Sequence, residues 1–113
     1  MTGDRDADRE QAIGAFGEAV NMTAGELEKW LETAESKSVG QSDGGGESVG
    51  HASGRRIAGL LRTKEADLGD DDIAHMRKVV GYVHRHMAQR PDGDPTDTRW
   101  RYSLMNWGHD PDR

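Results

Sequence analysis

Residues 48–57, SVGHASGRRI, form the boundary between a glycine-rich loop and a predicted helix, and the other predicted helices lie on either side of this boundary. The helix has two arginines near its start. A helix N-terminus presents backbone N–H groups without intrahelical acceptors and a partial positive charge. Arg55 and Arg56 add two full positive charges there. This combination predicts an anion site, and phosphate is the commonest biological anion that such a site binds.

Length and composition limit the chain to one small domain. It has 113 residues, of which 33% are hydrophobic and 32% charged, so we expect a thin core to which three tryptophans add area. Without cysteine, neither a disulfide framework nor a thiolate metal site can form, which fits a reducing cytoplasm. The N-terminus is acidic and polar, and no apolar run reaches the length of a membrane span. We therefore expect a cytoplasmic protein without a membrane partner.

The charges are distributed unevenly along the chain. Residues 1–50 carry four basic and eleven acidic side chains, whereas residues 51–109 carry ten basic and eight acidic ones, although the net charge is −6. A dipolar molecule of this kind can meet a polyanion with one face. Solvation of the charges alone is the equally weighted alternative.

Apolar residues at helical spacing predict an all-α protein without a sheet. The spacing indicates helices over 10–21, 23–35, 53–65 and 98–107, and the clearest helix begins after Gly69 and ends before Pro91. Thr23 and Glu26 form a capping box, Ser53 is the expected N-cap of the third helix, and Gly108 is the expected stop of the last. We thus expect one domain of four to five helices over 10–109, with a flexible Gly/Ser loop over 36–52, a disordered acidic tail over 1–9 and a short tail over 110–113.

The long loop has two interpretations. It contains a short repeat, KSVGQS at 37–42 and ESVGHAS at 47–53, in which each copy places a hydroxyl beside a glycine. Such turns can aim N–H groups at an anion, or they can be two ordinary turns joined by a hinge. The loop is not a phosphate-binding P-loop, because His51 and Ala52 stand where Lys and Ser or Thr are required.

The third and fourth predicted helices share a second sequence pattern, which lies on the sides away from their apolar stripes. Each carries two cations seven residues apart with a glycine between them: Arg55, Gly59 and Arg62 on one, and Lys78, Gly81 and Arg85 on the other. A glycine inside a helix costs about 1 kcal/mol relative to alanine, which close approach of a phosphate backbone or of another helix would offset. Tolerance of glycine in a glycine-rich chain is the rival explanation. The two cationic faces would form one surface if the helices pack side by side.

Catalytic and metal-binding patterns are weak. His84 and His86 point to different sides of their helix, and His75 and His86 lie three turns apart, so neither pair can hold one metal ion. There is no nucleophile-elbow motif, and the carboxylates lie at helix starts or on an acidic outer face around Glu28 and Glu32, which should point away from any phosphate. We expect no cofactor, no metal, no small-molecule substrate and no enzymatic activity.

Six blocks of the chain are distinctive when taken together: EKWL (28–31), SKSVG (36–40), GESVGH (46–51), SGRRI (53–57), HMRKVVGYVHRH (75–86) and RWRYSLMNWGH (99–109). They resemble one family of small proteins of unknown function that is found in bacteria, archaea and fungi. The resemblance spans roughly residues 16–111, and no catalytic or binding residues map onto this chain. Members of the family are often labelled DNA-binding proteins, so the resemblance implies a role with DNA.

Nucleic-acid binding is the first functional prediction. Phosphate contacts should dominate and sequence specificity should be weak, although the net charge of −6 counts against a dedicated binder. The alternative is a non-enzymatic interaction module or a homodimer that uses the faces around Gly59 and Gly81. The stripe of Trp100, Leu104 and Trp107 is expected to dock on the other helices rather than to stack on bases. The predicted phosphate-binding residues are Ser48, His51, Ser53, Gly54, Arg55, Arg56, Arg62, Lys78 and Arg85.

Overall fold

The computed structural model describes residues 2–39 and 48–112, and side chains from residue 7 onward. These residues form six α-helices and a 3₁₀ turn, and no strand occurs among them. The expected all-α class is confirmed, with one helix more than the sequence predicted. The elements are α1 (Thr2–Ala19), α2 (Ala24–Leu31), α3 (Ala34–Ser38), α4 (Val49–Leu61), η1 (Glu65–Asp67), α5 (Asp70–Met87) and α6 (Arg99–Asn106).

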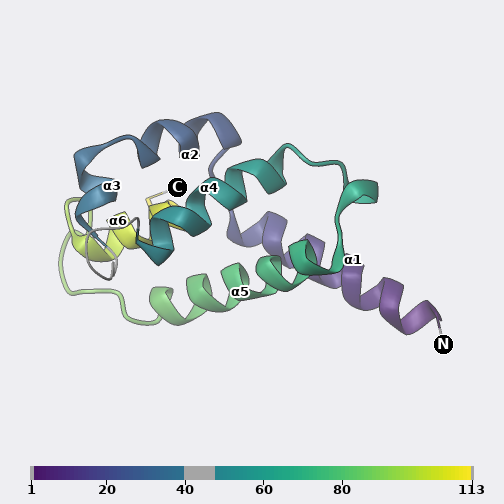
Figure 1. Ribbon diagram of the computed structural model, residues 1–113. Helices are drawn as coiled ribbons and strands as arrows, with labels where there is room; N and C mark the ends of the chain where they lie inside the picture. The colour runs from purple at the N-terminus through teal and green to yellow at the C-terminus, as the bar shows by residue number, and fades with distance from the viewer. Residues whose placement is uncertain (1, 40–47, 113) are drawn as a thin grey trace.

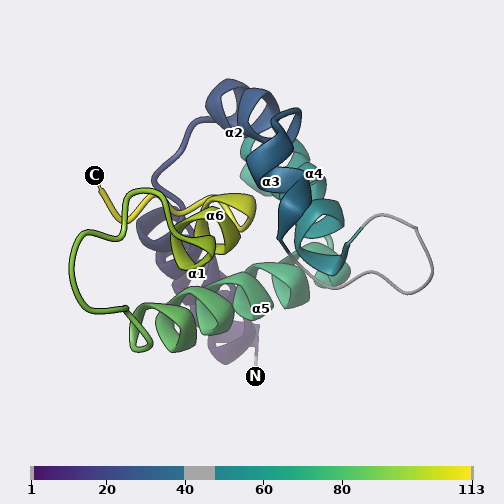
Figure 2. The same ribbon diagram turned by 90° about the vertical axis from the view of Figure 1, so that its left-hand side faces the viewer.

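The helices are arranged as two pairs that α6 joins (Figure 1). The helix α1 packs along α5, and α2 packs along α4. The C-terminal helix α6 contacts α2, α3, α4 and α5, so it lies between the pairs, as the turned view also shows (Figure 2). The predicted third and fourth helices are α4 and α5, and they belong to different pairs.

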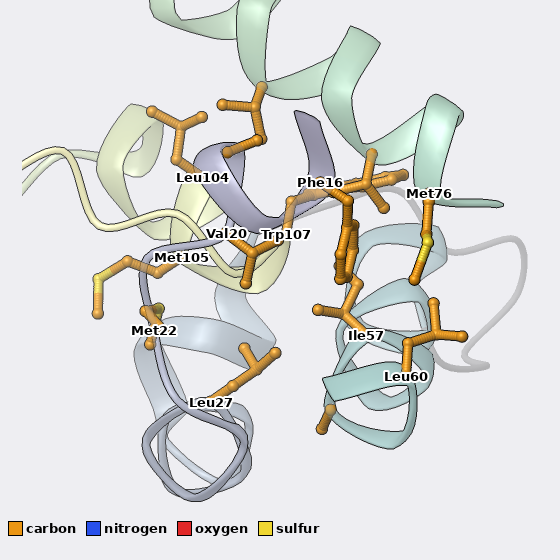
Figure 3. Packing of buried hydrophobic residues seen from close by; sticks show 14 of the residues in the cluster. Phe16, Val20, Met22, Leu27, Ile57, Leu60, Met76, Leu104, Met105 and Trp107 are labelled. Carbon is orange, nitrogen blue, oxygen red and sulfur yellow. The ribbon is translucent and has the colours of Figure 1, made fainter. Parts of the chain in front are cut away.

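The apolar core lies where the two pairs meet α6 (Figure 3). Phe16 from α1, Ile57 and Leu60 from α4 and Met76 from α5 point toward one another, with Trp107 beside them. All five side chains are buried. Trp100 and Leu104 are buried as well, so the expected docking of the last helix on the others is confirmed.

Capping residues set the helix ends in the α2–α3 region. Thr23 and Glu26 form the predicted capping box at the start of α2. The predicted continuation to residue 35 is wrong, because α2 ends at Leu31 and α3 starts three residues later. Thr33 caps α3 by accepting a hydrogen bond from the Ser36 N–H, which competes with continuation of α2.

A buried asparagine connects α2, α3 and α6. Asn106 is 1% exposed, and its Oδ1 accepts hydrogen bonds from Trp30 Nε1 at 2.7 Å and from Ser36 Oγ at 2.5 Å. Its Nδ2 donates to the Ser36 carbonyl at 3.1 Å. Because buried polar groups must be paired, this arrangement fixes the position of α3 against α6.

The C-terminal segment is held on the junction between α1 and α2. Gly108 has the positive φ of 82° that the predicted helix stop requires, and its carbonyl accepts from the N–H groups of Asn21 and Met22. The Asn21 side chain exchanges two hydrogen bonds with the backbone of Asp110, at 2.9 and 2.7 Å. The C-terminal segment is therefore tied to the junction between α1 and α2.

Two predicted segments differ from the structure. The tail over 1–9 was expected to be disordered, whereas α1 begins at Thr2. The last turn before the core residue Ala12 is tied to other elements, since Arg9 donates to the Glu65 carbonyl and Arg77 donates to the Asp8 carbonyl. Of the predicted loop over 36–52, residues 40–47 lie outside the described part, and both flanks are helical. None of the helices in the described residues is both long and apolar enough to cross a bilayer.

Candidate nucleic-acid interface

The outer side of α4 carries three arginines around a glycine. Arg55 and Arg62 are exposed on the side opposite to the buried Ile57 and Leu60, and Arg56 is exposed at the edge of that side toward α5. No neighbouring atom lies within 4 Å of where a Cβ on Gly59 would stand. A flat or convex ligand can therefore approach the helix backbone between the guanidinium groups.

Arg56 and Arg62 have carboxylate neighbours on other helices. Arg62 Nη2 lies 2.6 Å from Glu28 Oε1, and this hydrogen bond raises the pKa of Arg62. Arg56 Nη2 lies 3.5 Å from Asp72 Oδ1 and donates to the Asp71 carbonyl. Exposed ion pairs contribute little to stability because water and salt screen them, so a phosphate can replace the carboxylates.

The acidic face of α2 lies beside the arginines of α4 and not away from them. Arg55 lines a groove of about 380 Å³ between α2 and α4, together with Glu28, Glu32 and Lys37. Because α2 and α4 form one helix pair, the acidic face that was expected to point away from any phosphate borders the arginines themselves. Glu28 and Glu32 lie along the edge of the arginine side that faces α2, and the opposite edge faces α5.

The cations of α5 form a separate group. Lys78 and Arg85 are exposed, and neither has an ion-pair partner among the residues that the structure describes. The Arg85 guanidinium lies over Gly81, with Nη1 3.1 Å from where a Cβ would stand. Gly81 is thus covered by this chain's own side chain, whereas Gly59 is open.

The two cationic groups approach each other at one point. The side-by-side packing of α4 and α5 that would join the two groups into one surface is not found, since each helix packs mainly on another one. The two helices meet where Ser53 Oγ lies 2.9 Å from His75 Nε2 and where Arg56 reaches Asp72. The structure therefore brings Ser53, Arg56 and Lys78 together around His75, and it leaves Arg55 and Arg62 toward α2.

The start of α4 differs from its prediction. Ser53 was the expected N-cap, but the N-cap is Ser48, whose hydroxyl accepts from the His51 N–H. Ser48 offers a capping hydroxyl at an earlier position, so the helix begins at Val49 and includes residues 49–53 of the repeat. Ser53 consequently lies in the second turn of α4, where it is 5% exposed.

Other predicted residues near this start make packing contacts. His51 Nε2 lies 2.6 Å from the Leu31 carbonyl. A Cβ on Gly54 would stand 2.5 Å from the Asn106 carbonyl oxygen and 2.7 Å from Leu31 Cδ2. Gly54 thus permits the close approach of α4 to α2 and α6, which gives it a structural role independent of any anion.

His75 is held among groups of both charges. Burial lowers its pKa below the ordinary value of 6.5, the charges of Arg56 and Lys78 lower it further, and Asp72 opposes them. The Ser53–His75 pair resembles half of a catalytic triad. However, the serine is buried, and Asp72 accepts from the Gly69 N–H and from Arg56 rather than from His75. In the described residues, no three His, Asp or Glu side chains are grouped as a metal site would require.

Trp107 is the residue near this point that sequence reasoning assigned to the core alone. Its ring stacks on Tyr82 at 4.2 Å between centroids and on His75 at 6.3 Å. Its Nε1 lies 3.2 Å from where a Cβ on Gly50 would stand. No local sequence pattern could have revealed the contact between Trp107 and Gly50, because these two residues are 57 positions apart in the sequence.

The fold and the site define a small all-helical protein with an arginine-rich side on one helix. Residues 15–105 match the model of a family described as a protein of unknown function (DUF3140), and the chain belongs to this family. The match runs from the second half of α1 to the last turn of α6. No curated protein and no solved structure matches the chain.

Proposed function

We propose that this protein binds nucleic acid, DNA in the first instance, by contacting phosphates with the outer side of α4. The observation that supports this most is the open space at Gly59 between Arg55, Arg56 and Arg62. Arginine is suited to phosphate because its planar fork donates two hydrogen bonds at once. A glycine between such forks lets a phosphodiester backbone approach the helix without a side chain in between.

The neighbouring charges orient the approach. Glu28 and Glu32 repel phosphates at the α2 edge, whereas Arg56 and Lys78 attract them at the α5 edge. The polyanion therefore lies across α4 toward α5. The net charge of −6 does not prevent this, because the acids outside the interface are screened over about 10 Å at moderate salt.

Binding through phosphates predicts a steep salt dependence. Fluorescence anisotropy of labelled duplex and single-stranded oligonucleotides, measured from low to moderate salt, gives the slope of log K against log salt. Each phosphate contact contributes about −0.9 to the slope for duplex DNA. We expect the double variants Arg55→Glu/Arg62→Glu and Lys78→Glu/Arg85→Glu each to reduce the slope by about 2 or to abolish binding.

A matched control changes the same net charge elsewhere. Lys29 and Arg99 are exposed on α2 and α6, so Lys29→Glu/Arg99→Glu should leave the slope nearly unchanged. Absence of binding to either oligonucleotide at low salt contradicts the proposal. Equal losses in the control and in the arginine variant also contradict it, because they would indicate a net-charge effect without a defined surface.

Self-association is the second candidate function, and the same open side of Gly59 favours it. A helix from a second copy would need small residues at the contact, and Gly59 provides one that no side chain among the described residues covers. Light scattering separates the two functions. If the protein is a dimer through this face, Gly59→Leu should halve the mass while helicity is retained, and Gly81→Leu should not. A wild-type monomer removes this candidate.

A further inference from the structure

The three tryptophans differ in what their indole N–H groups bind. Trp30 Nε1 donates to Asn106 Oδ1 at 2.7 Å, and Trp100 Nε1 donates to the His86 carbonyl at 2.6 Å. Within the described residues, Trp107 Nε1 has no acceptor, although the side chain is 4% exposed. The Nε1 atom is not among the fully buried unpaired polar atoms of the described residues, so a ligand can reach it and accept a hydrogen bond from its N–H.

The unpaired indole lies at the N-terminus of α4. Gly50 is the second residue of that helix, and a Cβ there would stand 3.2 Å from Trp107 Nε1. Because Cα–Cβ bonds tilt toward the N-terminus of a helix, the space that Gly50 leaves lies on the side of the first N–H groups. Ser48 satisfies the His51 N–H, and no acceptor for those of Val49 and Gly50 occurs in the described part of the chain.

Nearby side chains favour a negative ligand. Arg56 and Lys78 both lie close enough to His75 to lower its pKa, and the ring of His75 stacks on Trp107. Asp72 is the acidic group that faces His75, and its two oxygens are engaged by Arg56 and the Gly69 N–H. Val49, the first residue of α4, is 61% exposed, so the helix start is open to solvent.

We propose that a phosphate group binds at the N-terminus of α4, where it accepts hydrogen bonds from Trp107 Nε1 and from the N–H groups of Val49 and Gly50. Lys78 supplies a neighbouring positive charge. The site adds to the proposed function by giving one backbone phosphate of the nucleic acid a fixed position, and it rests on that function for the source of the phosphate. Gly50 keeps the indole N–H accessible, since any larger residue would occupy the space.

Nuclear magnetic resonance of the three indole N–H groups tests the site directly. The ¹⁵N-labelled protein is titrated with inorganic phosphate against chloride at constant ionic strength, and separately with an unlabelled oligonucleotide. We expect a saturable shift of the Trp107 signal in both titrations, with much smaller shifts for Trp30 and Trp100. Signals that move together, or a Trp107 signal that neither ligand moves, overturn the proposal.

Two glycine substitutions, each at the second position of a helix, provide the matched pair. Gly50→Ala should weaken phosphate binding at least tenfold because the methyl group covers the indole N–H. Gly25→Ala, at the second position of α2 with no atom within 4 Å, should leave it unchanged. If Gly50→Ala disturbs the fold, Lys78→Gln on the exposed side of α5 replaces it and should weaken binding severalfold. Equal affinity in the wild type and in the variant used overturns the site.

The two proposals fail in different ways. If the oligonucleotide binds by anisotropy while the Trp107 signal stays in place, the phosphate site is wrong and the arginine interface stands. If inorganic phosphate shifts the Trp107 signal and no oligonucleotide binds, nucleic-acid binding is wrong, and the site takes its phosphate from a small phosphorylated molecule.

Discussion

Single glycines determine how closely the helices approach. Gly54 faces a backbone oxygen of Asn106 and the side chain of Leu31, whereas Gly59 in the same helix faces open space. Sequence reasoning treated Gly54 as part of an anion site. Its position shows a packing role, because a backbone oxygen cannot rotate away from a new methyl group.

Alanine substitutions at Gly54 and Gly59 should change the free energy of unfolding in opposite directions. Gly54→Ala should lower the free energy of unfolding by about 1–3 kcal/mol through overpacking. Gly59→Ala should raise it by up to about 1 kcal/mol, because alanine favours the helix and meets nothing. Urea denaturation followed by circular dichroism measures both. Equal effects of the two substitutions would contradict the close approach of α4 to α6.

Two histidines make stability depend on pH. Burial lowers the pKa of both His75 and His86 below 6.5, and His86 Nε2 is shielded from solvent without a partner. Between the lowered pKa and 6.5, the unfolded chain binds more protons than the folded one. The contribution is therefore complete above pH 6.5 and is lost as the pH falls through 6.5 and then through the folded pKa.

Urea midpoints between pH 8 and pH 5 test this dependence. We expect the midpoint to fall below pH 6.5, and His86→Phe should remove part of the fall while it keeps a ring between Tyr82 and Trp100. His84→Gln, at an exposed position on the same helix, should retain the dependence of the wild type. A midpoint that rises on acidification would contradict the assignment.

At the scale of elements, the buried Asn106 holds a helix of five residues in place. The helix α3 is too short to be stable by itself, so its position depends on the hydrogen bonds between Ser36 and Asn106. The polar hub also receives the Trp30 indole from α2. Three elements therefore depend on one side chain.

Removal of this side chain should be costly. Asn106→Ala leaves the buried Ser36 hydroxyl and the Trp30 indole without their acceptor, at about 1–3 kcal/mol for each orphaned group. Ser36→Ala should cost less, because Trp30 keeps its partner. A double-mutant cycle over Ser36 and Asn106 gives the coupling, which we expect to exceed about 0.5 kcal/mol. Additive losses would show that the two residues act independently.

At the scale of the whole molecule, closure depends on the segment after α6. Gly108 has a positive φ of 82°, and a Cβ there would stand 2.9 Å from Val20 Cγ1. Gly93 has a similar φ of 86° with nothing within 4 Å. The two positions therefore separate backbone strain from steric fit.

We expect Gly108→Ala to destabilise the fold more than Gly93→Ala does. The positive φ alone costs about 1–2 kcal/mol for a residue with a Cβ, and the clash with Val20 adds about 1–3 kcal/mol. Thermal unfolding by calorimetry compares the two variants, and Val20→Ala in the Gly108→Ala background should recover part of the difference. Equal losses at both positions would contradict the tight closure.

Local features were predictable from the sequence, whereas the partnership of the helices was not. The capping box of Thr23 and Glu26, the apolar stripe of α5 and the stop at Gly108 depend on residues within a few positions of one another. The pairing of α4 with α2 depends on the space at Gly54 and on Asn106, far along the chain. The same contrast applies to the candidate nucleic-acid interface. The arginine side of α4 was predictable because its residues are local, whereas the acidic border was not, because α2 contributes it.

The proposed function depends on contact between nucleic acid and the arginine side of α4. This contact is measured by following the arginine Nε–H signals of the ¹⁵N-labelled protein as a duplex oligonucleotide is added at low salt. We expect shifts for Arg55, Arg56 and Arg62, and none for Arg101, whose guanidinium is held by Asp110 and Asp112. Binding that leaves the three α4 signals in place, or no shift of any signal, would show that nucleic acid does not bind this side of α4.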